Sequence, residues 1–196
     1  GGWLYLTKES ISTESNKGVF VNSVRKSIKK GRLNSISQLN GDRILCLEFI
    51  RGDQTSSLIF ELFHKGNAIL CQENKIFTVM RKKKFRHRSL SSGIEYQSPI
   101  GFNPFESNFS DFEKILLDSE RPFGASLTIN CNLGGEISNL VCHELKIDGK
   151  KPVVKSQIKS IYDRLQEILS DKINPTIFLD DEGNNFTVSC LNLTNL

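Results

Sequence analysis

A dense run of basic residues lies near the middle of the chain. The segment Arg81–Arg88 reads R-K-K-K-F-R-H-R and carries six formal positive charges in eight residues. Clustered Lys and Arg side chains neutralise the phosphates of a nucleic acid, and Phe85 or His87 can stack on an unpaired base. The alternative is a solvated, Lys-rich strand edge that prevents aggregation. The predicted phosphate contacts in this run are Arg81, Lys82, Lys83, Lys84, Arg86 and Arg88. Such contacts would hold a nucleic acid in place without reading its sequence.

An acid–base pair, Asp42-Arg43, is the second candidate. It stands between the turn signal Asn40-Gly41 and the nearly continuous apolar run Ile44–Phe49, so it lies at the mouth of a predicted strand. Taken alone, the pair is typical of an exposed turn salt bridge, which contributes little to stability.

A third candidate, Leu133-Gly134-Gly135, joins two predicted helices and is similar to the turn of a helix-hairpin-helix nucleic-acid motif. Glycines there let the backbone N–H groups at the start of the following helix approach a phosphate closely. An ordinary corner between two helices, with glycine at a helix C-terminus, fits the same spacing equally well.

Signatures of enzymes and metal sites are scarce. The sequence contains no Walker loop, no G-x-G-x-x-G motif and no G-x-S-x-G motif. Its three histidines lack metal-ligand spacing, and Asp180-Asp181-Glu182 lacks the spacing of a calcium loop. The five cysteines are widely spaced and never form C-x-x-C, which argues against a disulfide framework or a zinc site. We therefore expect a cytoplasmic protein without enzyme activity, cofactor or metal.

Charge is distributed unevenly along the 196 residues, of which 38% are hydrophobic and 24% charged, as in a soluble globular protein. Residues 1–100 contain 17 Lys and Arg against 8 Asp and Glu, a net +9, whereas residues 101–196 contain 9 against 14, a net −5. A basic surface concentrated in one module points to a polyanion, most often a nucleic acid. No apolar run approaches the roughly 20 residues that span a bilayer, so no membrane partner is expected.

The first half is predicted to contain one helix and several strands. The helix begins at Ser15 or Asn16, runs to about Lys30 and is ended by Gly31. The predicted strands cover residues 32–39, 43–50, 57–63, 68–71 and 75–80, and residues 3–7 also read as a strand. Because short turn signals separate the runs, we expect an antiparallel meander or sandwich with the helix packed on it.

The second half is predicted to be mainly helical and to follow a linker at 89–110 that is rich in Ser, Gly, Pro and Asn. Ser110 is expected to cap the first of these helices and Pro122 to start the second. The predicted helices cover 111–118, 122–130, 136–145 and 155–169, and a terminal hairpin covers 176–191. Apolar residues of the last helix form one continuous stripe of helical period.

Several strings of this sequence occur together, in the same order, in one known family. They are Arg25-Lys26, Gly31-Arg32-Leu33, Gln38, Asp42-Arg43-Ile44-Leu45, Glu61-Leu62-Phe63-x-Lys65-Gly66-Asn67-x-Ile69-Leu70, Arg88-x-x-x-x-Gly93-x-x-Tyr96-x-x-Pro99 and Asn132-Leu133-Gly134-Gly135. Over nearly its whole length, the sequence resembles the N-terminal part of NFACT proteins, which include the bacterial RqcH and FbpA-like group, archaeal members and eukaryotic NEMF.

The resemblance implies an α+β fold in two modules. Residues 1–100 would form an antiparallel β-sandwich like the N-terminal domain of the formamidopyrimidine-DNA glycosylases. Residues 101–196 would form a helix-hairpin-helix module with a terminal β-hairpin. The family's first strands and first helix would precede Gly1, and its coiled coil and C-terminal RNA-binding domain would follow Leu196.

The resemblance also implies a function. Family members bind tRNA and the large ribosomal subunit carrying a stalled peptidyl-tRNA, and they support extension of the nascent chain without mRNA. The family's Asp-Arg signature for tRNA engagement matches Asp42 and Arg43. We therefore expect Arg43 to contact a phosphate or base edge, and Asp42 either to orient it or to accept from a nucleotide hydroxyl or amino group. The other expected nucleic-acid contacts are Arg25 and Lys26 in the first module and the backbone of Gly134 and Gly135 in the second.

Two other functional classes compete with this hypothesis. A DNA glycosylase is suggested by shared architecture alone, and that chemistry needs an N-terminal proline amine as the nucleophile. An extracellular fibronectin-binding adhesin is suggested by the names of some relatives, and it would need a secretion signal.

Overall fold

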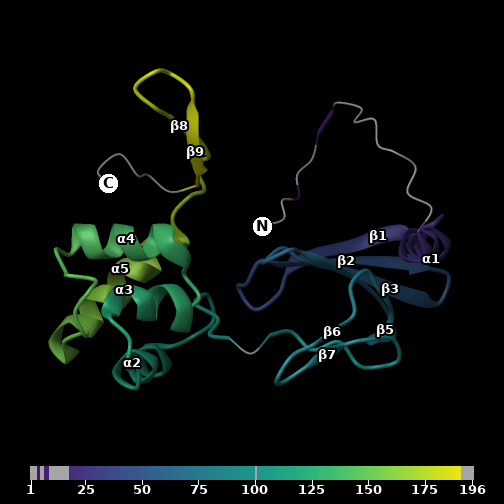
Figure 1. The fold of residues 1–196 in the computed structure, drawn as a ribbon, viewed down its shortest axis with the longest axis horizontal. Coiled ribbons are helices and arrows are strands. Elements are labelled where there is room, and N and C mark those ends of the chain that lie inside the picture. Colours follow the sequence, from purple (N-terminus) through teal and green to yellow (C-terminus); the bar gives the residue numbers. More distant parts are fainter. Residues whose placement is uncertain (1–3, 5–6, 9–17, 100, 191–196) are drawn as a thin grey trace. The chain divides into compact units, whose positions relative to one another are not determined.

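The computed structural model describes Leu4, Thr7, Lys8, residues 18–99 and residues 101–190 (Figure 1). The chain divides into two compact units, Gly1–Ile100 and Gly101–Leu196, each with its own hydrophobic core. Residues 3, 5 and 6 of the predicted strand at 3–7 and the predicted caps Ser15 and Asn16 lie outside the described residues. Leu4 and Thr7 are described and are not in a strand, and the N-cap of the first helix is Gly18.

An antiparallel five-stranded meander, in the order β1-β2-β3-β4-β5, forms the first unit. Its strands are β1 Arg32–Gln38, β2 Ile44–Arg51, β3 Gln54–Glu61, β4 Asn67–Gln72 and β5 Lys75–Val79. The inner strands β3 and β4 supply most of the buried apolar side chains, whereas every residue of the edge strand β1 is exposed. The turn signals predict all five strands to within three residues at each end.

Helix α1, Val19–Ile28, packs against one end of this sheet. There Nη1 of Arg51 donates to the carbonyl oxygen of Lys26 at 2.9 Å, and Nε2 of Gln72 donates to Oγ of Ser27 at 3.3 Å. The helix ends at Ile28 rather than near Lys30, and the left-handed residue after it is Lys30, with φ +65°, instead of the predicted stop Gly31. A Cβ at Gly31 would stand 3.0 Å from the carbonyl oxygen of Ile28, so a larger residue would force the backbone apart.

In the first unit, a short ribbon of β6 Lys83–Lys84 paired with β7 Ser89–Leu90 forms a second β-layer beside the five-stranded sheet. Leu90 is buried in the core of the first unit, with Phe85 and Tyr96 packed against it. The predicted α+β class is confirmed, but this layer is a ribbon with a following loop rather than a second large sheet. The charge density of the basic run explains the difference, because so many cations cannot be buried on a sheet face.

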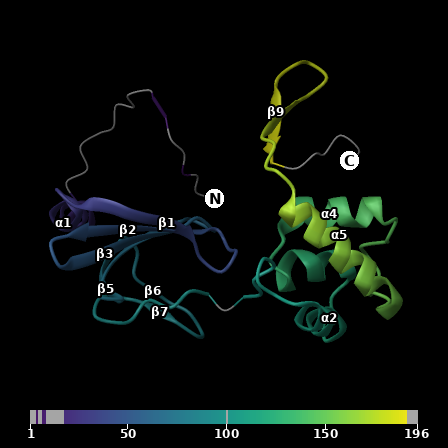
Figure 2. The same ribbon diagram turned by 180° about the vertical axis from the view of Figure 1, so that it is seen from behind.

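Helices build the second unit, and a hairpin completes it. They are α2 Phe109–Leu117, α3 Phe123–Ala125 continuing as the π-helix η1 Ser126–Asn130, α4 Gly134–Glu144, and the 3-10 turn η2 Lys155–Gln157 leading into α5 Ile158–Ser170. The hairpin pairs β8 Thr176–Leu179 with β9 Asn185–Ser189. Helix α5 contacts both α2 and α4 (Figure 2), and its predicted stripe buries Ile158, Ile161 and Leu165.

The starts of α2 and α4 in the second unit differ from the prediction. Helix α2 begins earlier because Asn108, rather than Ser110, provides the cap: its Oδ1 accepts the N–H of Asp111 at 3.0 Å. Helix α4 begins at Gly134 rather than at residue 136, because the chain turns one step earlier at Asn132, whose φ is +56°. None of the helices in the described ranges combines the length and hydrophobicity needed to span a bilayer.

Candidate nucleic-acid interface

Asp42 and Arg43 lie in the turn between β1 and β2, at one end of the sheet. The Asp42 carboxylate accepts the backbone N–H of Arg43 at 2.6 Å, and the Asp42 carbonyl oxygen accepts from Nε2 of Gln38 at 2.9 Å. The carbonyl oxygen of Arg43 accepts the N–H of Leu62 at 2.8 Å, which ties this turn to the end of β3. The Arg43 side chain is exposed and forms no hydrogen bond or ion pair with the described residues. The salt bridge considered from the sequence is thus not formed there, and the guanidinium is free to bind a ligand.

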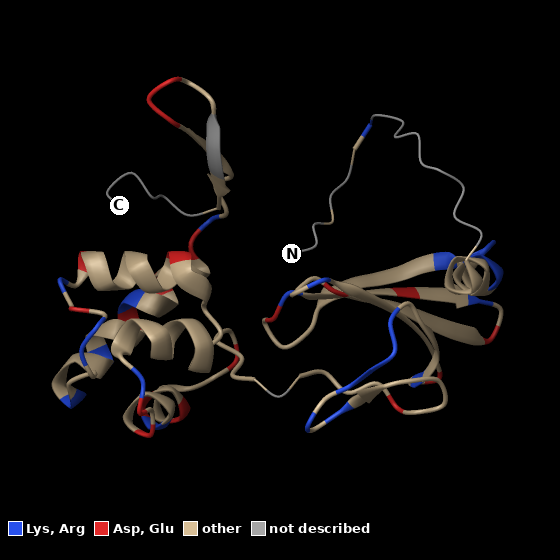
Figure 3. Ribbon diagram, viewed as in Figure 1, with Lys and Arg blue, Asp and Glu red and all other residues tan. Residues whose placement is uncertain are grey.

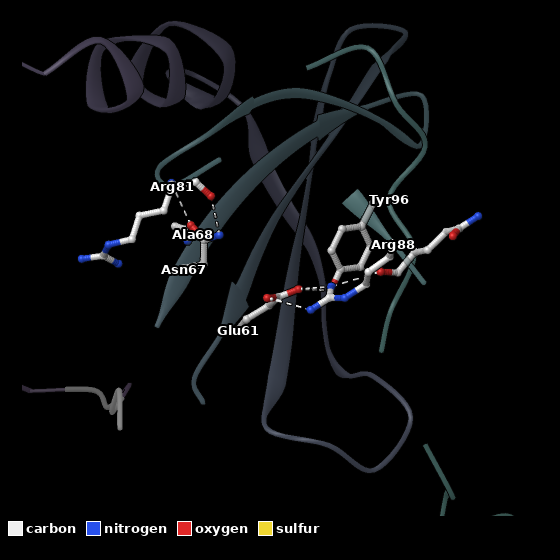
Figure 4. A network of polar contacts seen from close by, with 7 residues as sticks. Glu61, Asn67, Ala68, Arg81, Arg88 and Tyr96 are labelled. Carbon is white, nitrogen blue, oxygen red and sulfur yellow. Dashed lines mark hydrogen bonds and ion pairs between the residues drawn. The ribbon is translucent and has the colours of Figure 1, made fainter. Parts of the chain in front are cut away.

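Arg81 opens the basic segment Arg81–Arg88 and is fixed to the β3–β4 turn (Figure 4). Oδ1 of Asn67 accepts the N–H groups of Ala68 and Arg81, each at 3.0 Å. Nδ2 of the same Asn67 donates to the carbonyl oxygen of Arg81 at 2.9 Å. Nη1 of Arg81 donates to the carbonyl oxygens of Gly66, at 2.8 Å, and Lys65, at 3.2 Å. Arg81 therefore joins the basic segment to the turn, and Nη1 of its guanidinium is already hydrogen-bonded to the backbone there.

Arg88 closes the basic segment, and its side chain is buried beside Glu61. Their side chains are 7% and 3% exposed, and both Arg88 Nη atoms donate to the Glu61 carboxylate. The hydroxyl of Tyr96 donates to Oε1 of Glu61 at 3.1 Å, and Nη1 of Arg88 also donates to the carbonyl oxygen of Gln97 at 3.2 Å (Figure 4). The Phe85 ring centroid lies 4.7 Å from Cζ of Arg88. Arg88 thus holds the segment against the sheet, and its charge is neutralised there.

Burial shapes the chemistry of this network. A buried charge is stable only when it is paired and hydrogen-bonded, which the Glu61 carboxylate achieves through Arg88 and Tyr96. Burial, reinforced by the neighbouring carboxylate, raises the pKa of Tyr96, so its phenol stays protonated and donating at neutral pH.

Between these two fixed ends the basic segment presents its remaining cations to solvent. Those exposed cations are Lys82, Lys83, Lys84 and Arg86. In Figure 3 the basic segment is the blue stretch of chain that enters the β6–β7 ribbon, in which Lys83 and Lys84 form β6. The six cations predicted as phosphate contacts therefore divide into two structural residues at the ends and four accessible charges between them.

Arg25 and Lys26 lie in α1, at the opposite end of the sheet from Arg43. Strand β2 starts beside Arg43 and ends at Arg51, whose guanidinium binds the carbonyl oxygen of Lys26. At about 3.3 Å per residue, this eight-residue strand separates the two ends by roughly 25 Å. The predicted contacts of the first unit thus form two clusters, and the cluster at the Arg43 end includes the β3–β4 turn and the basic segment.

Gly134 and Gly135 are both exposed at the start of α4. Gly134 has φ +75°, a left-handed conformation that favours glycine, whereas Gly135 has open space where a Cβ would stand. Helix α4 has no side-chain cap, so its first N–H groups are not satisfied by a capping residue. Glu136 places a carboxylate in the same first turn, where it accepts from Oγ of Ser189 at 2.8 Å. Its negative charge would oppose a phosphate at this helix start.

Metal-binding groups are not assembled in the described part of the chain: no cluster of three or more His, Cys, Asp or Glu residues is placed to hold an ion. The five cysteines are free thiols. Burial raises the pKa of the Cys71 and Cys131 thiols to about 12.

Glu61 and Asn67, which hold the two ends of the basic segment in place, are not among the site residues that the sequence predicts. The sequence signal for Glu61 is a lone acid at the end of an apolar strand, and the structure leaves this residue only 2% exposed. Asn67 follows Lys65-Gly66 in a turn, where an amide side chain commonly bonds nearby backbone.

Fold and site together define an α+β module with exposed cations at one end of an antiparallel sheet, among them an Arg43 guanidinium that no described residue pairs. The family model for NFACT N-terminal and middle domains matches residues 2–196, and the chain belongs to this family. The predicted family resemblance is thereby confirmed.

Two curated relatives match most of this chain. The archaeal Rqc2 homolog aRqcH of Methanocaldococcus jannaschii is 26% identical over 198 residues, covering 92% of this chain and 29% of the relative. Ribosome quality control complex subunit 2 of Saccharomyces cerevisiae is 27% identical over 202 residues, covering 97% of this chain and 19% of the relative. The chain therefore spans less than a third of the length of either protein.

Solved structures share the fold. The N-terminal part of the fibronectin/fibrinogen-binding protein from Streptococcus suis superposes with a TM-score of 0.61 at 20% identity, covering 96% of this chain and 69% of that one. The fibrinogen-binding protein from Staphylococcus aureus gives a TM-score of 0.62 at 19% identity, covering 86% and 64%. These similarities establish the architecture.

Proposed function

We propose that this chain is the tRNA-binding and ribosome-binding module of a ribosome-associated quality control factor. The whole protein would bind the stalled large ribosomal subunit and support mRNA-independent extension of the nascent chain. Membership of the NFACT family supports this role, as do the two curated relatives, an Rqc2 homolog and a ribosome quality control complex subunit. The observation that carries the tRNA-binding proposal is the exposed Arg43 guanidinium, unpaired among the described residues, at the same end of the sheet as the basic segment.

Arg43 can bind RNA in a fixed orientation because its backbone is held on both sides. Its N–H is bonded to the Asp42 carboxylate, and its carbonyl oxygen is bonded to Leu62. The planar guanidinium would donate two parallel hydrogen bonds to a phosphate or a base edge. Asp42 would keep acceptor capacity for a ribose 2′-hydroxyl, the group that distinguishes RNA from DNA.

The exposed lysines of the basic segment would supply the second part of the affinity. Lys82, Lys83 and Lys84 would neutralise phosphates and release counterions, which makes binding salt-dependent but does not read sequence. We propose that the module acts by binding alone, without catalysis, cofactor or metal, in the cytoplasm where it meets ribosomes.

Filter binding with purified tRNA tests this proposal. The Arg43→Ala variant should weaken binding by about tenfold or more, because a charge-assisted contact is lost. Lys29→Ala is the matched control, since it removes one exposed charge from the α1 end of the sheet, and it should change affinity by less than about threefold. Equal losses in the two variants would show that only net charge matters and would contradict the proposal.

A further inference from the structure

A cavity of about 680 Å³ lies between the β3–β4 turn and the basic segment. Exposed Lys65, Lys82 and Lys83 line it, together with the half-buried rings of Phe63 and Phe85. Its volume falls within the range of pockets that hold small ligands. Nothing in the function proposed above assigns an occupant to it.

The lining favours a ligand that is both anionic and flat. Lysines attract phosphate, whereas an aromatic ring offers a stacking surface for a planar base. Phe85 already has Lys83 Nζ at 4.8 Å and Arg88 Cζ at 4.7 Å from its ring centroid. Phe63 has no such cation on its ring among the described residues and contacts the His64 ring edge to face, with 5.8 Å between the ring centroids, so we assign the base to Phe63. Glu61 also lines the cavity, but its carboxylate is paired with Arg88 and does not present an unbalanced charge to a phosphate.

The pocket is held in shape from both sides. Asn67 and Arg81 fix the β3–β4 turn to the start of the basic segment, and the Glu61–Arg88 pair fixes its end. The turn itself is set by left-handed conformations at His64, with φ +52°, and Gly66, with φ +68°. A pocket formed before binding loses little conformational entropy when a ligand enters.

We propose that this pocket receives one unpaired nucleotide of an RNA strand, with its base against Phe63 and its phosphate on Lys82 and Lys83. A paired nucleotide does not fit this chemistry, because its base faces are covered by stacking within the duplex. The proposal rests on the proposed RNA-binding function. It adds that the ligand at this end of the sheet is an unpaired nucleotide.

Fluorescence anisotropy with the full chain and a labelled six-nucleotide oligouridylate tests the pocket. The matched probe is an abasic ribose-phosphate hexamer of the same charge, and the second comparison is an RNA duplex made only of G·C pairs. The single strand should bind about fivefold or more tighter than the abasic hexamer, because stacking on one ring contributes that much. Equal affinities for these two probes, or equal affinities for single strand and duplex, would overturn the proposal.

Variants test the aromatic part and the basic part of the pocket one at a time. Phe63→Leu keeps an apolar side chain and should remove the preference for bases, whereas Phe63→Tyr should retain it; thermal melting checks that both fold. Lys82→Ala/Lys83→Ala should weaken binding of all probes and lower the salt dependence, with Lys29→Ala/Lys30→Ala as the equally charged control. A preference for bases that persists in Phe63→Leu with a normal melting profile would contradict the assignment.

The outcomes also separate this proposal from the function on which it rests. If tRNA binding depends on Arg43 but the base preference is missing, the pocket is wrong and the function stands. If the oligouridylate binds through Phe63 but tRNA does not bind, the pocket stands and the proposed function fails.

Discussion

Glu61→Gln should strongly destabilise the first unit, because it leaves a buried guanidinium without its counter-charge. Both side chains of the Glu61–Arg88 pair are less than a tenth exposed, and Tyr96 donates to the same carboxylate. Removing one partner of a buried ion pair costs about 3–5 kcal/mol. Since a whole domain is stable by only about 5–15 kcal/mol, the change removes a large share of the total.

Amide hydrogen exchange in β3 and β4 measures this effect. The chain has two compact units, so one denaturation midpoint would mix their transitions, whereas exchange in these strands reports on the first unit alone. The control is Asp163→Asn, which changes an acid to an amide in the pair Lys159–Asp163 on α5 of the second unit, and its cost is measured by amide exchange in α5. Those side chains are 65% and 53% exposed, so its loss should cost less than about 0.5 kcal/mol.

The double variant Glu61→Gln/Arg88→Met identifies the cause. Removing the second charge should recover part of the lost stability, because the uncompensated cation is then gone. A cost below about 1 kcal/mol for Glu61→Gln, or a double variant whose cost is the sum of the single ones, would refute the idea that pairing holds this carboxylate in place.

Three further predictions concern the reactivity of Cys71, the cost of substituting Gly134, and the effect of Tyr96 on stability at alkaline pH. Burial raises the pKa of Cys71 from 9.0 to about 12, so at pH 8 its thiolate is about a thousandfold scarcer than that of an ordinary thiol, and mass spectrometry after alkylation should find exposed Cys190 labelled first. Gly134→Ala should cost about 1 kcal/mol, measured by amide exchange in α4, because φ is +75°, whereas Gly135→Ala should be neutral. The raised pKa of Tyr96 stabilises the fold fully below pH 10, and this contribution is lost above it; Tyr96→Phe should flatten the alkaline fall in stability.

The strands and helices were predictable because turn residues and apolar periodicity mark them locally. The meander needs only short connections, and the stripe on α5 fixes its buried face. Helix starts were less predictable, since Asn108 and Ser110 are both good caps and backbone geometry decides between them.

The sequence of the basic segment does not predict which of its cations are held by the fold and which remain exposed. Arg81 and Arg88 carry the same charge as the lysines between them, and what separates them is contact with residues 14 to 27 positions away. Asn67 and Glu61 supply these contacts through tertiary structure alone. Local sequence reports how much charge a segment has, but its partners decide which charges remain free.

Hydrogen exchange of the full chain with and without tRNA tests the central claim most directly, namely that the Arg43 end of the sheet is the RNA-binding end. We predict slower exchange in the β1–β2 turn around Arg43, in the β3–β4 turn and across Lys82–Lys84, with smaller changes in α1. Protection concentrated in α1 or in the second unit, with none around Arg43, would contradict the account.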